Sequence, residues 1–235
     1  MLVADKTGGK QGAIFTTQVL GENKLSLIKT ADDTRRKRFM SDGSSRLTSG
    51  TVPYWANCTS PHGRAKRTIE PLVDKIYGGE ILEIGCSTGL STREIATLFP
   101  DSKITAIDNR EDAIEVAMRQ NLSLVKNRGV EFVLADGYFL AEWFGNRLFG
   151  TIMAMNNILF NLDSFPENDL ACVMHNLVRG LKTGGSLLFS KEEFSVLFRK
   201  EERRLMLLST TAKLSSDYKS INRLMEVANK PAIRP

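Results

Sequence analysis

Two glycines and two carboxylates in this chain have a spacing that suits ligand chemistry. Gly85 and Gly89 enclose three residues, and Glu83 comes just before them. Asp108 follows about twenty residues after this turn. Glycine lets the backbone turn tightly and lets a ligand approach the main chain closely. A carboxylate after the next strand suits a ribose with two free hydroxyls, so the spacing predicts an adenosine-containing ligand.

The elements that must position these residues are a strand, a helix and a second strand. Ile81, Leu82 and Ile84 give a short apolar run, typical of a parallel strand that is covered on both faces. The helix after Gly89 is expected to be capped by Ser91 or Thr92. A second apolar run then ends at Asp108, and ligands of open α/β sheets bind at that end of the strands.

Each of these residues also has an ordinary structural explanation. Gly85 and Gly89 could be tight-turn residues of any α/β protein. Asp108 could cap the helix that is expected from Glu111, and Asp136 could be a turn residue. The ligand site is favoured because all of these residues occur together.

Four segments of the chain resemble the motifs of a known family. They are LEIGCSTG at 82–89, AIDNRED at 106–112, LADG at 134–137 and LKTGGSLLF at 181–189. In this order and at this spacing they resemble the class I S-adenosylmethionine (SAM)-dependent methyltransferases, over residues 64–190. The chain lacks the G-x-G-x-x-G fingerprint of dinucleotide-binding proteins, which disfavours a nicotinamide oxidoreductase.

The resemblance implies an α/β fold with a doubly wound, mostly parallel sheet in the strand order 3-2-1-4-5 and helices on both faces. It also implies SAM as the cofactor, with the methionine end at residues 85–89, the ribose on Asp108 and the adenine at Asp136. Arg64 or Arg67, on the helix before the first strand, could reach the methionine carboxylate or could lie at the surface. The residues expected to bind the cofactor are Glu83, Gly85, Cys86, Ser87, Gly89, Asp108, Asn109, Asp136, Gly137 and Asn156.

Composition and charge restrict the class of protein. The 235 residues are enough for one large α/β domain with additions, or for two small domains. The formal net charge of +5 permits an anionic partner without requiring one. Cys58, Cys86 and Cys172 are scattered, which argues against a zinc site and against a disulfide framework. No apolar run has the length of a signal-peptide core or of a membrane span, so we expect a cytoplasmic protein without a membrane partner.

We expect two regions along the chain. Residues 1–63 should form a hairpin and a cap or lid, and residues 64–235 should form the SAM-binding Rossmann-like domain. Residues 13–20 and 24–29 are β-prone runs around a glycine and an asparagine, which indicates a hairpin with a three-residue loop.

Periodicity predicts the helices of the second region. Residues 64–77 are expected to form a helix whose regular part begins near Pro71. Residues 111–124 are expected to form a second helix.

The tail from residue 191 departs from the family pattern. Residues 194–211 fit either a charged amphipathic helix or a hairpin that turns at residues 201–202. A final helix is expected over residues 217–228. We therefore expect an atypical tail, with uncertain elements after the fifth strand.

The fourth strand, residues 150–155, should end beside the transferred methyl group, at Asn156 and Asn157. These amides lack the prolines that follow in amino methyltransferases, no cysteine nucleophile is near, and a hard cation prefers carboxylates. An amide can orient a nucleophile but cannot take its proton at neutral pH. We therefore expect no metal and assign no catalytic residue. The nearest candidate bases by residue type are Tyr54, Tyr138 and His175.

Three functions remain open at this point. The first is a methyltransferase for a small-molecule acceptor, which acts by proximity and orientation. The second is a methyltransferase for a protein or nucleic acid, held by basic residues, and the third is a non-catalytic SAM-fold binding protein. The basic residues are Arg35–Arg38, Arg199, Lys200, Arg203 and Arg204. We favour the first function because acidic residues interrupt the second basic run.

Overall fold

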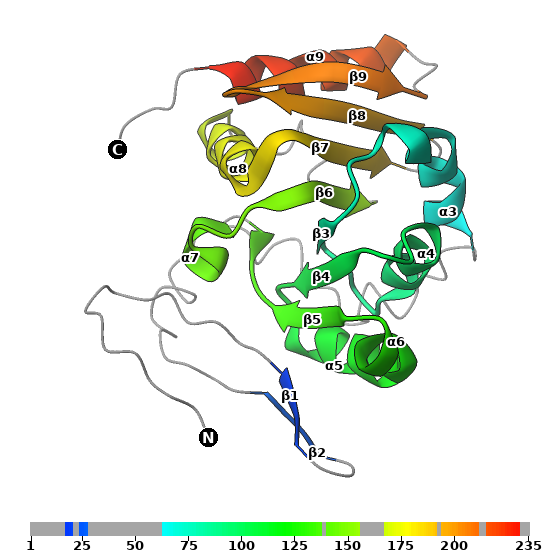
Figure 1. The fold of residues 1–235 in the computed structure, drawn as a ribbon. Helices are drawn as coiled ribbons and strands as arrows, with labels where there is room; N and C mark the ends of the chain where they lie inside the picture. The colour runs from blue at the N-terminus through cyan, green and yellow to red at the C-terminus, as the bar shows by residue number, and fades with distance from the viewer. Residues whose placement is uncertain are drawn as a thin grey trace.

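The computed structural model describes residues 17–20, 24–27, 63–137, 140–155, 167–191, 194–211 and 215–230. Seven strands of this part form one sheet, and helices cover both of its faces (Figure 1). Two further strands, near the N-terminus of the chain, form a small sheet of their own.

The large sheet contains the parallel core that the sequence predicts. Its strands are β3 (Glu80–Ile84), β4 (Lys103–Asp108), β5 (Val130–Leu134), β6 (Phe149–Met155), β7 (Leu181–Lys191), β8 (Phe194–Glu201) and β9 (Arg204–Thr210). Their spatial order is β5-β4-β3-β6-β7-β8-β9, so the first five confirm the order 3-2-1-4-5. β3 pairs in parallel with both β4 and β6, which places the reversal of strand order beside β3. Ligands of doubly wound sheets bind at this reversal.

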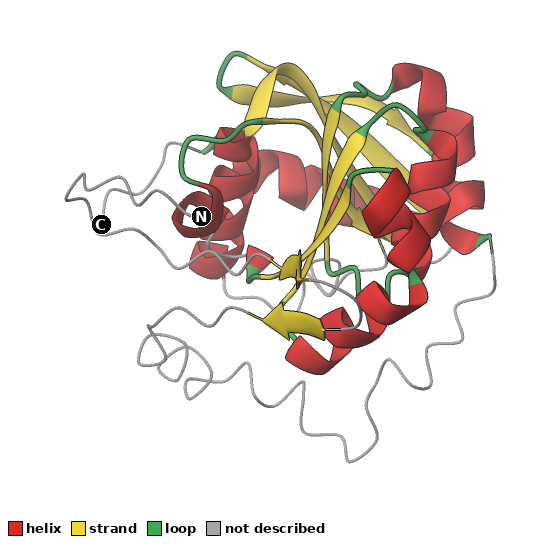
Figure 2. Ribbon diagram, turned by 60° about the horizontal axis from the view of Figure 1, so that its bottom comes forward, coloured by secondary structure: helices red, strands yellow, loops and turns green. Residues whose placement is uncertain are grey.

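Apolar side chains on both faces of the sheet hold the helices. One face carries α3 (Arg64–Ile69), the 3₁₀ segment η2 (Glu70–Lys75), α4 (Leu90–Leu98), α5 (Glu111–Gln120) and α6 (Leu122–Asn127). The other face carries α7 (Leu140–Phe144), α8 (Glu167–Gly180) and α9 (Ser215–Asn229). Figure 2 shows the two helical layers with the sheet between them. Every residue of β6 is buried, as expected for a strand in the middle of such a stack.

Two of the predicted helix starts are wrong. Pro71 does not begin the regular part of the first helix, because α3 has already ended and Pro71 lies in the first turn of η2. α4 has Gly89 at its N-cap, without a side-chain hydrogen bond. Ser91 and Thr92 do not cap it, because their hydroxyls donate to Glu83 instead.

The tail forms an antiparallel hairpin followed by a helix. β8 pairs with β7 and β9 pairs with β8, both antiparallel, and the hairpin turns between Glu201 and Arg204. The hairpin is therefore the correct alternative for residues 194–211. The expectation of an atypical tail stays a prediction. The final helix, predicted over residues 217–228, is α9.

β9 is the outer strand of the sheet, and Asn229 covers part of its free edge. The Asn229 Oδ1 accepts the Leu205 N–H at 2.9 Å, and its Nδ2 donates to the Leu205 carbonyl at 3.2 Å. The next three side chains of the strand, Met206, Leu207 and Leu208, are 46%, 39% and 39% exposed. An outer strand with free backbone groups and apolar side chains can pair with another chain, and Asn229 occupies one such backbone position.

The small sheet confirms the predicted N-terminal hairpin. β1 (Thr17–Leu20) pairs antiparallel with β2 (Lys24–Leu27) across the three residues 21–23. The rest of residues 1–62 lies outside the described part of the chain. The cap or lid role of residues 1–63, and the boundary with residues 64–235, therefore stay predictions.

Candidate cofactor site

Residues 85–89, the glycine loop, follow β3 in a tight left-handed conformation. The φ angles of Gly85, Ser87 and Gly89 are 75°, 49° and 78°. The first two N–H groups of the loop donate to the Ile107 carbonyl at 2.8 and 2.9 Å, which ties the loop to β4. A positive φ is uncommon for a serine, and such conformations gather where a ligand is held.

Asp108, at the end of β4, closes the glycine loop from the neighbouring strand. Its Oδ2 accepts the Ser87 N–H at 2.9 Å, and its Oδ1 accepts the Arg110 N–H at 3.0 Å. Burial raises the pKa of Asp108, and these two hydrogen bonds oppose the rise. The N-cap of α5 is Arg110, so Asp108 is not the helix cap. Each carboxylate oxygen keeps a further acceptor position, which fits two ribose hydroxyls.

Glu83 is fully buried beneath the glycine loop, on β3. The Ser91 hydroxyl donates to one of its carboxylate oxygens, and the Thr92 hydroxyl donates to the other at 2.5 Å. Burial raises the pKa of Glu83 to about 7 against these two hydrogen bonds, and the charge of Asp108 adds to the rise. Glu83 therefore connects β3 to the first turn of α4.

Cys86 is a buried packing residue of the glycine loop. Burial raises the pKa of its thiol well above the usual value, and the charges of Glu83 and Asp108 add to the rise. A nucleophilic cysteine needs a thiolate, which a lowered pKa would favour. In this position Cys86 shapes the loop as a neutral thiol.

The end of β5 completes the site on the third adjacent strand. The Ala135 N–H donates to the Asp108 carbonyl at 3.0 Å, and Asp136 follows, half-buried. A Cβ at Gly137 would come within 2.6 Å of Ile84 Cγ2, so only glycine fits so close to the end of β3. The structure thus brings the glycine loop, Asp108 and Asp136 to one end of the sheet.

The remaining predicted site residues are either exposed or outside the described part of the chain. Asn109 follows Asp108 and is exposed. Asn156 and Asn157 lie outside the described residues, as does Tyr138. Arg67 is exposed on α3.

One residue beside the site was missed by the sequence analysis. The helix predicted over residues 111–124 is two helices, α5 and α6, which meet at Asn121. Asn121 is 1% exposed and touches Gly89, the last residue of the glycine loop. The only signal in the sequence is a residue of modest helix propensity within an amphipathic pattern, and this signal does not predict burial.

His175 lies away from the glycine loop, between two helices. It belongs to α8, and its Nε2 lies 2.9 Å from the carbonyl oxygen of Lys230, just after α9. This position fits a residue that joins α8 to α9. The structure gives His175 no contact with the glycine loop.

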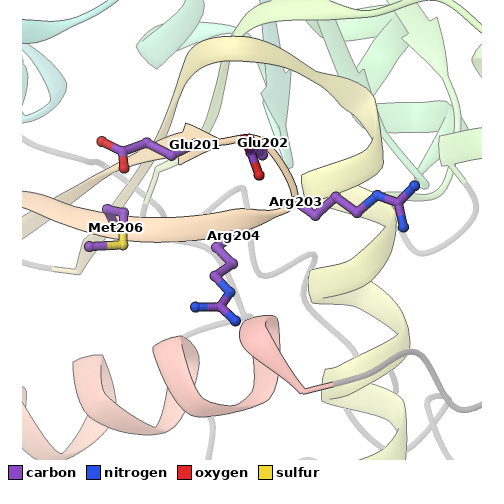
Figure 3. A pocket seen from close by; sticks show the side chains of 5 residues that line it. All are labelled: Glu201, Glu202, Arg203, Arg204 and Met206. Carbon is purple, nitrogen blue, oxygen red and sulfur yellow. The ribbon is translucent and has the colours of Figure 1, made fainter.

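The second basic run lies at the opposite end of the sheet from the glycine loop. Because β8 runs antiparallel to β7, the β8–β9 turn lies where the parallel strands begin. Figure 3 shows a hollow at this turn, and its lining mixes both signs of charge. The lining residues are Glu201, Glu202, Arg203, Arg204 and Met206. The first basic run, residues 35–38, lies outside the described part of the chain.

Within the described residues, no three His, Cys, Asp or Glu side chains gather in a way that could hold a metal ion. The expected absence of a metal stays a prediction. No helix in the described ranges is long and apolar enough to cross a bilayer.

Residues 81–185 match the family described as a methyltransferase domain. This segment runs from β3 into β7 and includes the glycine loop, Asp108 and Asp136. The match supports a class I SAM-dependent methyltransferase domain over these residues. The resemblance of the four sequence motifs is thereby confirmed, and SAM is the cofactor of this methyltransferase family.

Curated relatives of the methyltransferase domain have different names. A malonyl-[acyl-carrier protein] O-methyltransferase of Bacillus cereus is 34% identical over 134 residues, which are 53% of this chain and 45% of the relative. The release factor glutamine methyltransferase of Vibrio cholerae is 31% identical over 111 residues, which are 46% of this chain and 36% of the relative. The chain thus spans less than half the length of these relatives.

Solved methyltransferase structures have a similar but distant fold. The N-methyltransferase NodS of Bradyrhizobium japonicum WM9 has a TM-score of 0.43 at 23% identity, over 54% of this chain and 65% of that one. A SAM-dependent methyltransferase of Clostridium acetobutylicum has a TM-score of 0.48 at 13% identity, over 84% of this chain and 87% of that one. Likeness at this level adds nothing to the family assignment.

Proposed function

We propose that this protein transfers the methyl group of SAM to a small-molecule acceptor. The observation that carries the proposal is the position of Asp108. Its carboxylate accepts the Ser87 N–H of the glycine loop at 2.9 Å and keeps acceptor positions for a ligand. The match of residues 81–185 to a methyltransferase domain supports it.

Three parts of the site would hold the cofactor. The glycine loop, which has no side chain at Gly85 and Gly89, would lie along the methionine end. Asp108 would accept hydrogen bonds from the two ribose hydroxyls, and Asp136 would bond the adenine amino group. The cofactor contacts of Glu83, Cys86, Ser87, Asn109, Gly137 and Asn156 stay part of the same proposal.

The chemistry asked of the protein is alignment and exclusion of water. SAM supplies a methyl group that is already activated by the sulfonium charge. Much of the rate can therefore come from holding the acceptor atom in line with that group, without a fixed catalytic base. In the described part of the chain, Cys86 is a neutral buried thiol. The Nε2 of His175, on α8, is hydrogen-bonded with the carbonyl of Lys230, just after α9. Neither residue is placed as a base for the acceptor. The acceptor or solvent would then take up the proton.

Calorimetry with SAM, S-adenosylhomocysteine and NAD tests the cofactor. We expect SAM and S-adenosylhomocysteine to bind at one site per chain, in competition with each other. Tight binding of NAD together with no binding of SAM would overturn the proposal.

A malonyl-[acyl-carrier protein] O-methyltransferase among the relatives supports an oxygen acceptor on a small acyl group. The release factor glutamine methyltransferase favours a second candidate, a methyltransferase that acts on a protein. The position of the second basic run, at the far end of the sheet, supports the small acceptor.

A screen with radiolabelled SAM separates these candidates. The panel would contain carboxylic acids, acyl thioesters, phenols, amines and a protein extract. Label in a small acid or thioester is the expected result, whereas label in a protein band alone would favour the second candidate. SAM binding without turnover on any acceptor would favour a non-catalytic SAM-fold protein.

A further inference from the structure

Asn121 is a buried amide at the break between α5 and α6. Its side chain is 1% exposed, and it makes three polar contacts. Its Nδ2 donates to the Ala117 carbonyl at 2.7 Å and lies 3.5 Å from the Thr88 carbonyl. Its Oδ1 accepts the Arg93 Nε–H at 3.1 Å. One side chain thus connects the α5–α6 break, the glycine loop and α4.

The hydrogen-bond network fixes the orientation of this amide. A guanidinium can only donate, so the atom that faces Arg93 must be the amide oxygen. A backbone carbonyl can only accept, so the atom that faces Ala117 must be the amide nitrogen. No flipped orientation of Asn121 satisfies both partners, and the nitrogen therefore lies on the side of the glycine loop.

Asn121 also supports the end of the glycine loop by direct contact. A Cβ at Gly89 would come within 2.6 Å of the Asn121 Nδ2 and within 3.0 Å of the Phe132 ring. Asn121 and Phe132 therefore fill the space beside the Gly89 Cα, where a side chain would lie. A larger side chain or a negative charge at Asn121 would press against or repel the main chain of Gly89 and Thr88.

The other parts of the glycine loop have their own supports. The Ile107 carbonyl holds its first two N–H groups, and Asp108 holds the Ser87 N–H. Glu83 holds the first turn of α4 through Ser91 and Thr92. At the remaining segment, Asn121 and the Phe132 ring lie against Gly89, and Asn121 also approaches the Thr88 carbonyl.

We propose that Asn121 is a positioning residue for the SAM site: it holds the Thr88–Gly89 end of the glycine loop in the conformation that receives the cofactor. The proposal rests on the proposed function of that site. The Thr88 contact of 3.5 Å is long for a hydrogen bond, so packing against Gly89 supplies much of the support before the ligand binds.

The test replaces the amide nitrogen with an oxygen of the same size. In Asn121→Asp, a carboxylate oxygen faces the Ala117 and Thr88 carbonyls, and their repulsion should displace the loop end. We expect the Kd of SAM to rise about tenfold, the loss of roughly one hydrogen bond of a buried polar group. With an acceptor in hand, KM for SAM should rise while kcat at saturation stays within about twofold, as for a loss of uniform binding.

Two controls separate positioning from loss of stability. Asn229→Asp makes the same change in an amide that also donates to a backbone carbonyl, at the outer strand of the sheet. Leu224→Ala removes a buried side chain of α9 and should lower the Tm at least as much as Asn121→Asp. Both controls should leave the Kd of SAM within about twofold of the wild-type value. If Asn121→Asp fails to fold, Asn121→Ser replaces it, with the same expected direction.

Hydrogen exchange gives a readout that needs no cofactor. Exchange of the amides of residues 87–91 should accelerate in Asn121→Asp and stay at the wild-type rate in Leu224→Ala. Wild-type SAM affinity together with wild-type exchange in Asn121→Asp would overturn the inference and leave the proposed function intact. A wild-type protein that binds no SAM would instead remove the proposed function, and the inference that rests on it.

Discussion

At the scale of single residues, the candidate site contains two carboxylates, Glu83 and Asp108, that are shielded from water to different degrees. Glu83 is fully buried and bonds only to hydroxyls among the hydrogen bonds described above, whereas Asp108 is half-buried and holds two backbone N–H groups. Burial raises the pKa of both. The two residues should therefore respond differently to substitution: Glu83 through stability and Asp108 through ligand affinity.

Glu83→Gln tests the buried carboxylate. Its pKa is about 7 in the folded protein against an ordinary value of 4.5, so the folded state binds the proton more tightly than the unfolded state does. The contribution of this group to the free energy of unfolding is full below pH 4.5 and is lost as the pH rises through about 7. The loss is at most about 3 kcal/mol, from the size of the shift. Urea unfolding of Glu83→Gln between pH 5 and 8 should show a flatter pH dependence, and an unchanged slope would contradict this prediction.

Asp108→Ala tests the ribose contact. We expect the SAM affinity to fall by about 1.5–3 kcal/mol, the range for a hydrogen bond to a charged group. Calorimetry measures the change, and Asp112→Ala is the matched control, because Asp112 is an exposed carboxylate of the same segment that pairs with Arg110. Equal affinities of Asp108→Ala and Asp112→Ala would show that Asp108 does not bind the ligand.

At the scale of elements, the outer strand β9 needs protection from other chains. Asn229→Ala would free the N–H and C=O of Leu205, next to the exposed Met206, Leu207 and Leu208. We expect the variant to self-associate at concentrations where the wild type does not, because the unpaired backbone groups of an edge strand can pair with another chain. Sedimentation velocity over a concentration series measures this. Glu226→Ala, an exposed change one turn earlier on α9, is the control, and identical profiles for the two variants would contradict the prediction.

The hairpin of β8 and β9 shows why the sequence left an alternative open. Residues 194–211 contain apolar residues at spacings that suit both a strand and a helix. Tertiary packing decides between the two. Leu197 packs on the face of the sheet that carries α3, whereas Val196 and Phe198 pack on the face that carries α8 and α9. A strand can present side chains to both faces in this alternation, and a helix cannot. The covering helices are not visible from the segment itself.

The parallel strands and the glycine loop were predictable because their signals are local. Short apolar runs mark β3 to β6, and a glycine at a positive φ has few substitutes. Asn121 was not predictable, because its contacts are with Gly89 and Arg93, which are distant along the chain. The roles of Ser91 and Thr92 were missed for the same reason: Glu83 takes the hydroxyls that would otherwise cap α4.

At the scale of the whole molecule, the sheet separates the candidate site from the second basic run. We therefore expect Arg203→Ala with Arg204→Ala to leave kcat/KM within about twofold, since such exposed charges act mainly on nearby ligands. The kinetic assay is the acceptor reaction found by the screen. A large loss of kcat/KM in the variant, together with a similar loss in the wild type when salt is added, would instead indicate an anionic macromolecule held by these arginines.

The meander of β7, β8 and β9 has a consequence for the order of folding during synthesis. Each of these strands pairs with its neighbour in sequence, so its contacts are local and can form quickly once the residues leave the ribosome. β3, in contrast, must wait for β6, its partner across the reversal of strand order. A nascent chain that ends after β7 would carry an unpaired strand at its edge until the hairpin and α9 emerge. Ribosome pausing within residues 192–230 should therefore increase aggregation more than pausing within residues 63–100.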